Sequence, residues 1–216
     1  MTTTSEDLLE GSRPSPLQIL APIAALVFVF VVIWSGADSQ TIWYLIRGAG
    51  VIAYVLLALS VVVGLLIAGR AVPAGRSRVD LYEVHTFTSL LALAFGLAHA
   101  LTLLLDNFTP FTPVQVLIPF TSDYRPFPVA LGIVGIYLTA AVYGSFWMRR
   151  RIGYKRWRAF HYTTFAAFIL LTAHAIFSGA DAHTVWLVFI MIACCLMVSV
   201  LTIYRATSRQ PAARGA

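Results

Sequence analysis

Two stretches of the sequence decide the fold: HTFTSLLALAFGLAH at residues 85–99 and HYTTFAAFILLTAH at residues 161–174. Each is an apolar run that begins and ends with histidine. Backbone groups in lipid must bond within their own segment, so such runs predict membrane helices and not open strands. Ionisable residues inside membrane helices are rare and point to a functional site. The two stretches therefore predict two helices that share a site built from four imidazoles.

Around these stretches the sequence has six apolar runs, each close to the roughly 20 residues that a helix needs to cross a bilayer. The predicted spans are residues 17–34, 43–69, 84–105, 129–147, 160–177 and 185–204. We expect an all-α integral membrane bundle of six helices over residues 17–204, between an N-terminal tail, 1–16, and a C-terminal tail, 205–216. The composition agrees, because 11% of the residues are charged and a soluble domain carries roughly 25%.

Basic residues gather on one side of the bundle if the helices alternate in direction. They lie in both tails and in the second-to-third and fourth-to-fifth loops: Arg13, Arg70, Arg76, Arg78, Arg149, Arg150, Arg151, Lys155, Arg156, Arg158, Arg205, Arg209 and Arg214. The positive-inside rule then places both termini in the cytoplasm of a multi-pass protein of the plasma or inner membrane. The net charge of +6 thus reflects topology and the adjacent lipid, and it does not indicate nucleic acid. The acidic, polar start has no signal-peptide pattern, so we expect the first run to stay in the mature protein.

The outer side is predicted to carry one long loop, residues 106–128. Its five prolines predict no regular element, and its apolar piece, 114–120, is too short to span and is expected to lie on the interface or to cover an outer site. The roles of this loop and of His183 stay open. Asp181 and His183 could bind ferric iron or another metal, although a solvated loop histidine is the ordinary interpretation. Cys194 and Cys195 are interpreted as small core residues.

The four intramembrane histidines are expected to meet in pairs. His85 and His99 are fourteen positions apart and His161 and His174 thirteen, which correspond to rises of about 21 Å and about 20 Å along a helix. The third and fifth helices cross in the same direction, so His85 should meet His161 at an inner level and His99 should meet His174 at an outer level.

Rotation around the helix axis fits one stretch better than the other. Fourteen residues return to within about 40° of the starting face, whereas thirteen leave an offset of about 140°. We therefore expect the fifth helix to be locally irregular between His161 and His174, or the two sites to be laterally displaced. Small residues between the histidines would let a planar ring approach, although ordinary helix packing uses them equally: Ala92, Ala94, Gly96, Ala98, Ala166 and Ala167.

Two pairs of neutral imidazoles at two levels favour two haem b groups, each with two axial histidines. The metal ligands are then predicted to be His85 with His161 and His99 with His174. A zinc site needs three or four ligands converging on one ion, and no intramembrane carboxylate or thiolate completes either pair, which argues against metal transport.

On these residues the sequence resembles the ferric reductase-like transmembrane domain family, which includes ferric reductases, NADPH oxidases and the haem subunit of the periplasmic methionine sulfoxide reductase system. The resemblance rests on the six spans, the histidine spacing and the basic run with Trp157 ahead of His161. It implies that Arg47, near the start of the second span, binds a haem propionate; snorkelling to the headgroups is the alternative.

The sequence departs from many members of that family, because no glycine-rich dinucleotide motif follows the sixth span. The resemblance therefore implies the haem subunit of an oxidoreductase that is not self-sufficient with NAD(P)H. A separate flavoprotein or membrane quinol would donate electrons, and a redox partner protein or ferric iron would accept them outside. The alternative is a non-catalytic membrane subunit of a larger complex with one haem or none, and no residue is assigned a catalytic role.

Overall fold

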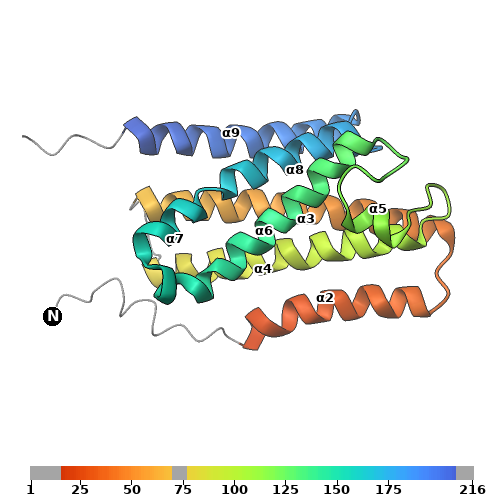
Figure 1. Ribbon diagram of the computed structural model, residues 1–216, viewed down its shortest axis with the longest axis horizontal. Coiled ribbons are helices and arrows are strands. Elements are labelled where there is room, and N and C mark those ends of the chain that lie inside the picture. The colour runs from red at the N-terminus through yellow and green to blue at the C-terminus, as the bar shows by residue number, and fades with distance from the viewer. Residues whose placement is uncertain (1–15, 70–76, 208–216) are drawn as a thin grey trace, which may run out of the picture.

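The computed structural model describes residues 16–69 and 77–207, and within these ranges every regular element is a helix. The all-α class predicted from the sequence is therefore confirmed for the described residues. The elements follow one another as α2 (Pro16–Trp34), α3 (Ser39–Gly69), α4 (Arg78–Thr102), η1 (Leu103–Leu105), α5 (Pro113–Leu117), α6 (Pro126–Ile152), α7 (Tyr154–His161), α8 (Thr164–Ser178) and α9 (Val185–Thr207) (Figure 1).

Five segments of the described chain are long and apolar enough to cross a membrane, judged by length and composition: Ser39–Gly69, Arg78–Leu105, Pro126–Ile152, Tyr154–Ser178 and Val185–Thr207. The protein is therefore a multi-pass membrane protein. The first predicted span corresponds to α2, but its apolar stretch, Leu20–Val32, is shorter than the other five. The count of six spans and the cytoplasmic placement of the termini remain predictions, although the start of α2 and the end of α9 point to the same end of the bundle (Figure 1).

α3 and α4 begin several residues before the predicted apolar runs, and polar side chains cap their first turns. Asp38 accepts a 2.7 Å hydrogen bond from the Thr41 backbone N–H at the start of α3, and bonds from Thr41 hold the pKa of this carboxyl below its usual value. Ser77 and Asp80 form a capping box at the start of α4. Each device satisfies N–H groups that the first turn of a helix leaves unpaired.

The expectation that residues 106–128 form no regular element is wrong at two places, because α6 already begins at Pro126 and a short helix precedes it. Residues Pro113–Leu117 form the short helix α5. Pro113 stands in its first turn, where the missing N–H costs nothing, and Thr112 and Gln115 form a capping box. The proline therefore starts this helix where we expected it to prevent one.

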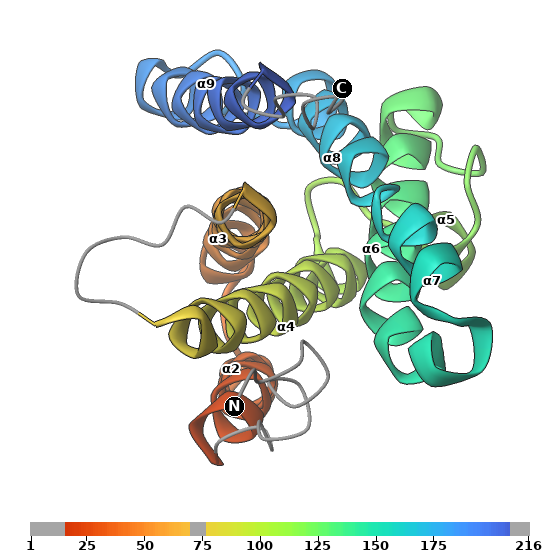
Figure 2. The same ribbon diagram turned by 90° about the vertical axis from the view of Figure 1, so that its left-hand side faces the viewer.

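The helices pack as two closely associated pairs with further helices against them. α3 packs along α4 and α6 along α8, while α9 lies on α3 and α2 on α4. α4 and α8, which carry the four histidines, have no comparable packing against each other, and Figure 2 shows them as separate rods in the end-on view. Between the two levels of histidines the core holds Tyr54 of α3, stacked on Phe168 of α8 with ring centroids 5.8 Å apart.

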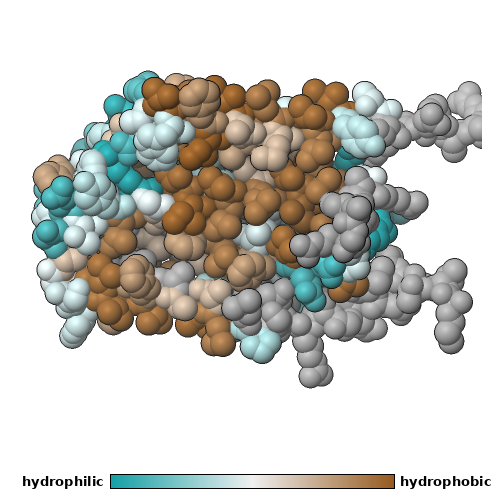
Figure 3. Space-filling view, turned by 180° about the vertical axis from the view of Figure 1, so that it is seen from behind, coloured by the Kyte–Doolittle hydropathy of each residue, from teal (hydrophilic) through white to brown (hydrophobic). Residues whose placement is uncertain are grey.

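Large apolar side chains face outward on the flank of the bundle. Ile169, Phe189 and Val200 are examples, each at least 60% exposed. In Figure 3 the flank is mostly hydrophobic, and hydrophilic residues gather toward the ends. Because lipid tails take the place of water around such a flank, this apolar surface fits a protein that lies within a bilayer.

Candidate functional site

Four histidine side chains meet in two pairs at two levels of the bundle. α4 and α8 run in the same direction (Figure 1), so the first histidines of the two helices lie together and so do the second. The ring centroids of His85 and His161 are 6.1 Å apart and those of His99 and His174 are 6.3 Å apart. The ring planes are steeply inclined, at 67° and 75°. These are the pairs expected from the sequence.

Both centroid distances match two imidazoles on opposite sides of one metal ion. A metal–imidazole bond is about 2.0–2.1 Å long and the bonding nitrogen lies about 1.1 Å from the centre of its ring, so the two ring centres would stand about 6.3 Å apart. Two histidines joined directly by a hydrogen bond would have their ring centres closer together than the observed distances. Within the described residues no group of three or more histidines, cysteines or acids could hold a metal ion, so a metal at either level would find two histidines as protein ligands.

Three of the four rings are fixed by a hydrogen bond from Nδ1 to a backbone carbonyl of a neighbouring helix. The bonds run from His85 to Ser60 (2.9 Å), from His99 to Ile46 (2.8 Å) and from His174 to Pro128 (2.9 Å). A carbonyl oxygen can only accept, so Nδ1 carries the proton and Nε2 keeps its lone pair. Such bonds orient a metal-binding imidazole and raise its basicity.

A glycine lies behind each of these three rings. An added Cβ would stand 3.3 Å from the His85 ring at Gly64, 3.1 Å from the His99 ring at Gly50 and 2.6 Å from the His174 ring at Gly132. Each glycine comes four residues after the carbonyl that accepts the Nδ1 hydrogen bond. The missing side chain lets the imidazole reach the helix backbone, so the glycine and the carbonyl act together as one seat for the ring.

The spacing of these seats explains how α3 serves both levels. Gly50 and Gly64 are fourteen residues apart, as are His85 and His99 on the antiparallel helix α4. The same number of residues gives the same rise and rotation on both helices. One helix pair can therefore repeat the same contact at the inner and the outer level.

Sequence reasoning did not identify these glycines. It considered small residues on the histidine helices themselves, of which Ala92, Ala98 and Ala167 are buried and Ala166 is exposed. The seats lie on the partner helices α3 and α6. The shared interval of fourteen residues between Gly50–Gly64 and His85–His99 was the signal that could have revealed two of them.

His85 has more polar neighbours than the other three histidines. Its Nδ1 also lies 3.2 Å from the Ser60 hydroxyl, which is 2.6 Å from the hydroxyl of Ser89. Ser89 in turn donates to the His85 carbonyl at 2.6 Å. These hydroxyls join α3 to α4 around the inner histidine and restrain its ring.

His161 differs from the other three. Its Nδ1 is buried and has no hydrogen-bond partner among the described residues, and the same holds for the neighbouring Trp157 Nε1. The rings of these two residues lie 5.0 Å apart. Gly144 of α6, twelve residues after Gly132, has nothing within 4 Å of an added Cβ, so it does not serve His161 as a seat.

The irregularity expected in the fifth span separates the two histidines. The helix is interrupted at Tyr162 and Thr163, between α7 and α8, so the offset of about 140° for thirteen residues of ideal helix does not apply. The interruption turns His161 toward His85 while His174 faces His99. It also places His161 at the end of an eight-residue helix instead of within a long one.

Arg47 lies next to Ile46, whose carbonyl binds the outer His99. Its guanidinium donates to the Asp181 carboxylate at 2.7 Å, with both side chains 24% exposed. It also lies 3.3 Å over the ring of Trp43. The structure thus ties Arg47 to the loop before α9, and His183 in the same loop is exposed.

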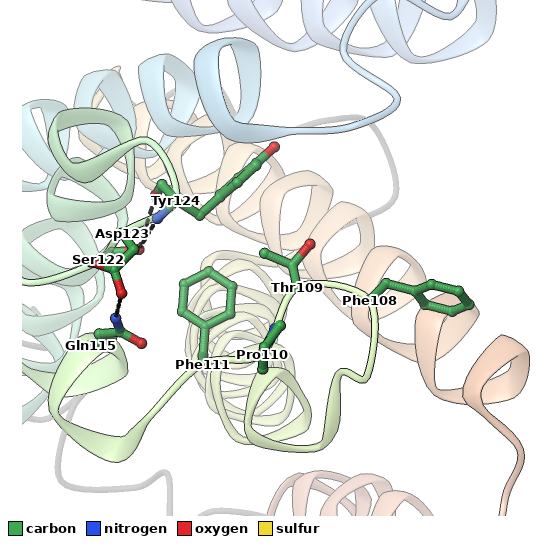
Figure 4. A pocket seen from close by; sticks show the side chains of 8 residues that line it. All are labelled: Phe108, Thr109, Pro110, Phe111, Gln115, Ser122, Asp123 and Tyr124. Atoms are coloured by element: carbon green, nitrogen blue, oxygen red, sulfur yellow. Dashed lines mark hydrogen bonds between the residues drawn. The ribbon is translucent and has the colours of Figure 1, made fainter.

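The outer loop lines an open pocket of about 350 Å³ (Figure 4). Phe111 and Tyr124 lie edge to face across it, and Gln115 donates to Asp123 at 2.7 Å. Tyr124 also donates to the Ser178 carbonyl at the end of α8, 3.3 Å away. The loop therefore connects α5 to the end of the helix that carries His174.

One family model matches the chain, the ferric reductase like transmembrane component, over residues 49–172. The match includes His85, His99 and His161 and ends two residues before His174. No curated protein and no solved structure matches the chain.

Proposed function

Because the chain belongs to the ferric reductase-like transmembrane family, we propose that it is a di-haem b-type protein that carries electrons across the membrane. A transmembrane domain of this family indicates a membrane electron-transfer module. The observation that carries the proposal is the pair of imidazole spacings, 6.1 Å and 6.3 Å, at two levels of one bundle.

His85 and His161 would hold the inner haem, and His99 and His174 the outer one. Haem supplies a one-electron couple at its iron. Two imidazoles on each iron would leave no open position for oxygen, which suits electron transfer better than oxygen binding. The carbonyl bonds to three of the rings keep Nε2 free to bind and hold it in place.

Electrons would enter at the end of the bundle that carries α7 and leave at the end that carries α5. Exposed basic residues at the α6–α7 junction, such as Arg151 and Arg156, provide a surface for an acidic donor protein. A separate flavoprotein or membrane quinol is the proposed donor, and a redox partner protein or ferric iron the proposed acceptor. The positive-inside rule makes the basic end cytoplasmic, in a plasma or inner membrane.

Arg47 would serve a propionate of the outer haem. It adjoins the carbonyl that orients His99, and a guanidinium has five N–H donors, more than its bond to Asp181 uses. Anionic propionates favour such a partner. In this arrangement Asp181 and the propionate share one cation.

A reduced-minus-oxidised spectrum of the purified protein, with haem quantified per chain, tests this function. We expect a low-spin b-type spectrum and about two haems per chain. His99→Ala and His85→Ala should each remove one haem, and His183→Ala, which changes an exposed histidine outside the pairs, should remove none. A protein purified from haem-sufficient cells without a low-spin spectrum contradicts the proposal. One haem per chain supports the alternative of a single-haem membrane subunit.

A further inference from the structure

We propose that His161 is the displaceable ligand of the inner site, so that a small uncharged molecule such as carbon monoxide can take its place on the iron. This inference rests on the proposed function, because it requires haem between the histidine pairs. It assigns the inner site a ligand-binding capacity that the outer site lacks. Its evidence is the different anchoring of the four imidazoles.

The outer pair is anchored on both sides. His99 is bonded to the Ile46 carbonyl and His174 to the Pro128 carbonyl, and each ring lies against a glycine of the partner helix. A ring that leaves the iron from this seat must break its carbonyl bond and move against a packed backbone. Both outer ligands are therefore held at the metal by contacts outside the metal bond.

The inner pair is anchored on one side. His85 is bonded to the Ser60 carbonyl and lies on Gly64. His161 has a buried Nδ1 without a partner among the described residues. Gly144, the next glycine along α6 from the His174 seat, has nothing within 4 Å of an added Cβ. His161 therefore depends on the metal bond to a degree that the other three do not.

The backbone around His161 also permits movement. His161 ends α7, and Tyr162 and Thr163 separate that helix from α8. A rotation of α7 need not disturb the hydrogen-bonded turns that carry His174. Trp157 Nε1 on the same helix is also buried without a hydrogen-bond partner among the described residues, so no such bond fixes either polar group in place.

The hydrogen bond that His161 lacks sets the expected difference in ligand exchange between the inner and the outer site. Removing the partner of a metal-binding histidine lowers metal affinity about 10-fold to 100-fold. The exchange breaks the bond from iron to His161 Nε2 and forms one from iron to the carbon of carbon monoxide. No electron is transferred, the iron stays ferrous, and the imidazole remains attached to α7. An uncharged ligand is required because a charge would be costly to bury inside the bundle.

The test is a carbon monoxide titration of the reduced, full-length protein, followed by absorption spectroscopy. We expect about half of the haem to bind carbon monoxide and the remainder to keep its bis-imidazole spectrum. A variant that keeps only the inner pair, with His99→Ala and His174→Ala, should bind carbon monoxide at its remaining haem. A variant that keeps only the outer pair, with His85→Ala and His161→Ala, should bind at least 10-fold more weakly.

A single substitution provides a second test that does not depend on the double variants. Gly132→Ala places a Cβ 2.6 Å from the His174 ring and should make the fraction of outer haem that this variant retains reactive as well, whereas Gly144→Ala should leave the wild-type reactivity unchanged. If no haem reacts in the wild-type protein, or if the outer-only variant reacts as readily as the inner-only one, the inference about His161 is wrong. The proposed function is judged separately, by the spectrum before carbon monoxide is added. A low-spin spectrum at that point supports the function even if the inference about His161 fails, and a missing low-spin spectrum contradicts the function.

Discussion

The imidazole of His174 lies directly on the backbone of Gly132, with Nδ1 2.6 Å from the position that a Cβ would occupy. Real Cβ atoms do not approach another atom so closely, so any side chain at residue 132 must displace the ring. The Nδ1 hydrogen bond to the Pro128 carbonyl, one turn earlier, sets the same orientation. The glycine is therefore a requirement of the outer site, although it cannot bind a cofactor itself.

Gly132→Ala is expected to release the outer haem. Displacement of His174 breaks its carbonyl bond and moves Nε2 away from the metal, which should lower outer-haem affinity about 10-fold to 100-fold. Haem per chain after purification, measured as the pyridine haemochrome, should fall from about two toward about one. Gly144→Ala is the control on the same helix, because its Cβ meets nothing within 4 Å. Equal haem content in the two variants would contradict the claim that His174 needs a glycine at residue 132.

Gly50→Ala and Gly64→Ala are expected to reduce haem affinity less than Gly132→Ala does. Their added Cβ atoms would lie 3.1 Å and 3.3 Å from the rings of His99 and His85, so each ring must yield by only a few tenths of an ångström. We expect a shifted midpoint potential of one haem and less than about 10-fold loss of its affinity. Gly48→Ala, which meets nothing within 4 Å, should change neither value. A redox titration of the three variants distinguishes these outcomes.

The ring planes predict the magnetic signature of the ferric protein. The paired imidazoles are inclined at 67° and 75°, and nearly perpendicular axial rings leave two iron d orbitals close in energy. Electron paramagnetic resonance should therefore show strongly anisotropic low-spin signals with a raised largest g value. Signals of the ordinary rhombic type, which parallel rings produce, would show that the planes rotate when haem binds.

Arg47 and Asp181 are expected to shift the potential of the outer haem in opposite directions. A nearby cation favours the reduced, less positive iron, so Arg47→Ala should lower the midpoint potential. Asp181→Asn leaves the charge of Arg47 without its 2.7 Å partner and should raise that potential. Arg47→Lys keeps the charge and should have the smallest effect. Shifts of the inner haem alone, or no shift in any variant, would exclude this role for Arg47.

The pairing of the histidines could be predicted because it depends on distance along the helix. Fourteen and thirteen residues give nearly equal rises, and co-directional helices then bring equal rises to equal depths. The same arithmetic predicted either an irregular fifth span or two laterally displaced sites, and the structure has the irregular span. The arithmetic could not locate the interruption at Tyr162 and Thr163, because neither residue is a proline or glycine that marks a break.

The seats could not be predicted because they depend on which helices are neighbours. Ile46, Ser60 and Pro128 contribute only carbonyl groups, which every residue possesses and which leave no pattern in the sequence. The bond from Arg47 to Asp181 joins residues 134 positions apart, and nothing local indicates it. The helix α5 was missed for a different reason, since prolines were interpreted as breakers where Pro113 occupies a first turn.

The division of the bundle into α3 with α4 and α6 with α8 would give the proposed haem groups a second task, which is to hold the two helix pairs together. The imidazoles reach across from one hairpin to the other, and the helices that carry them do not pack closely together. Newly inserted hairpins would associate loosely until haem arrives to join them. The amount of protein that survives proteolysis in a cell should consequently follow the supply of haem.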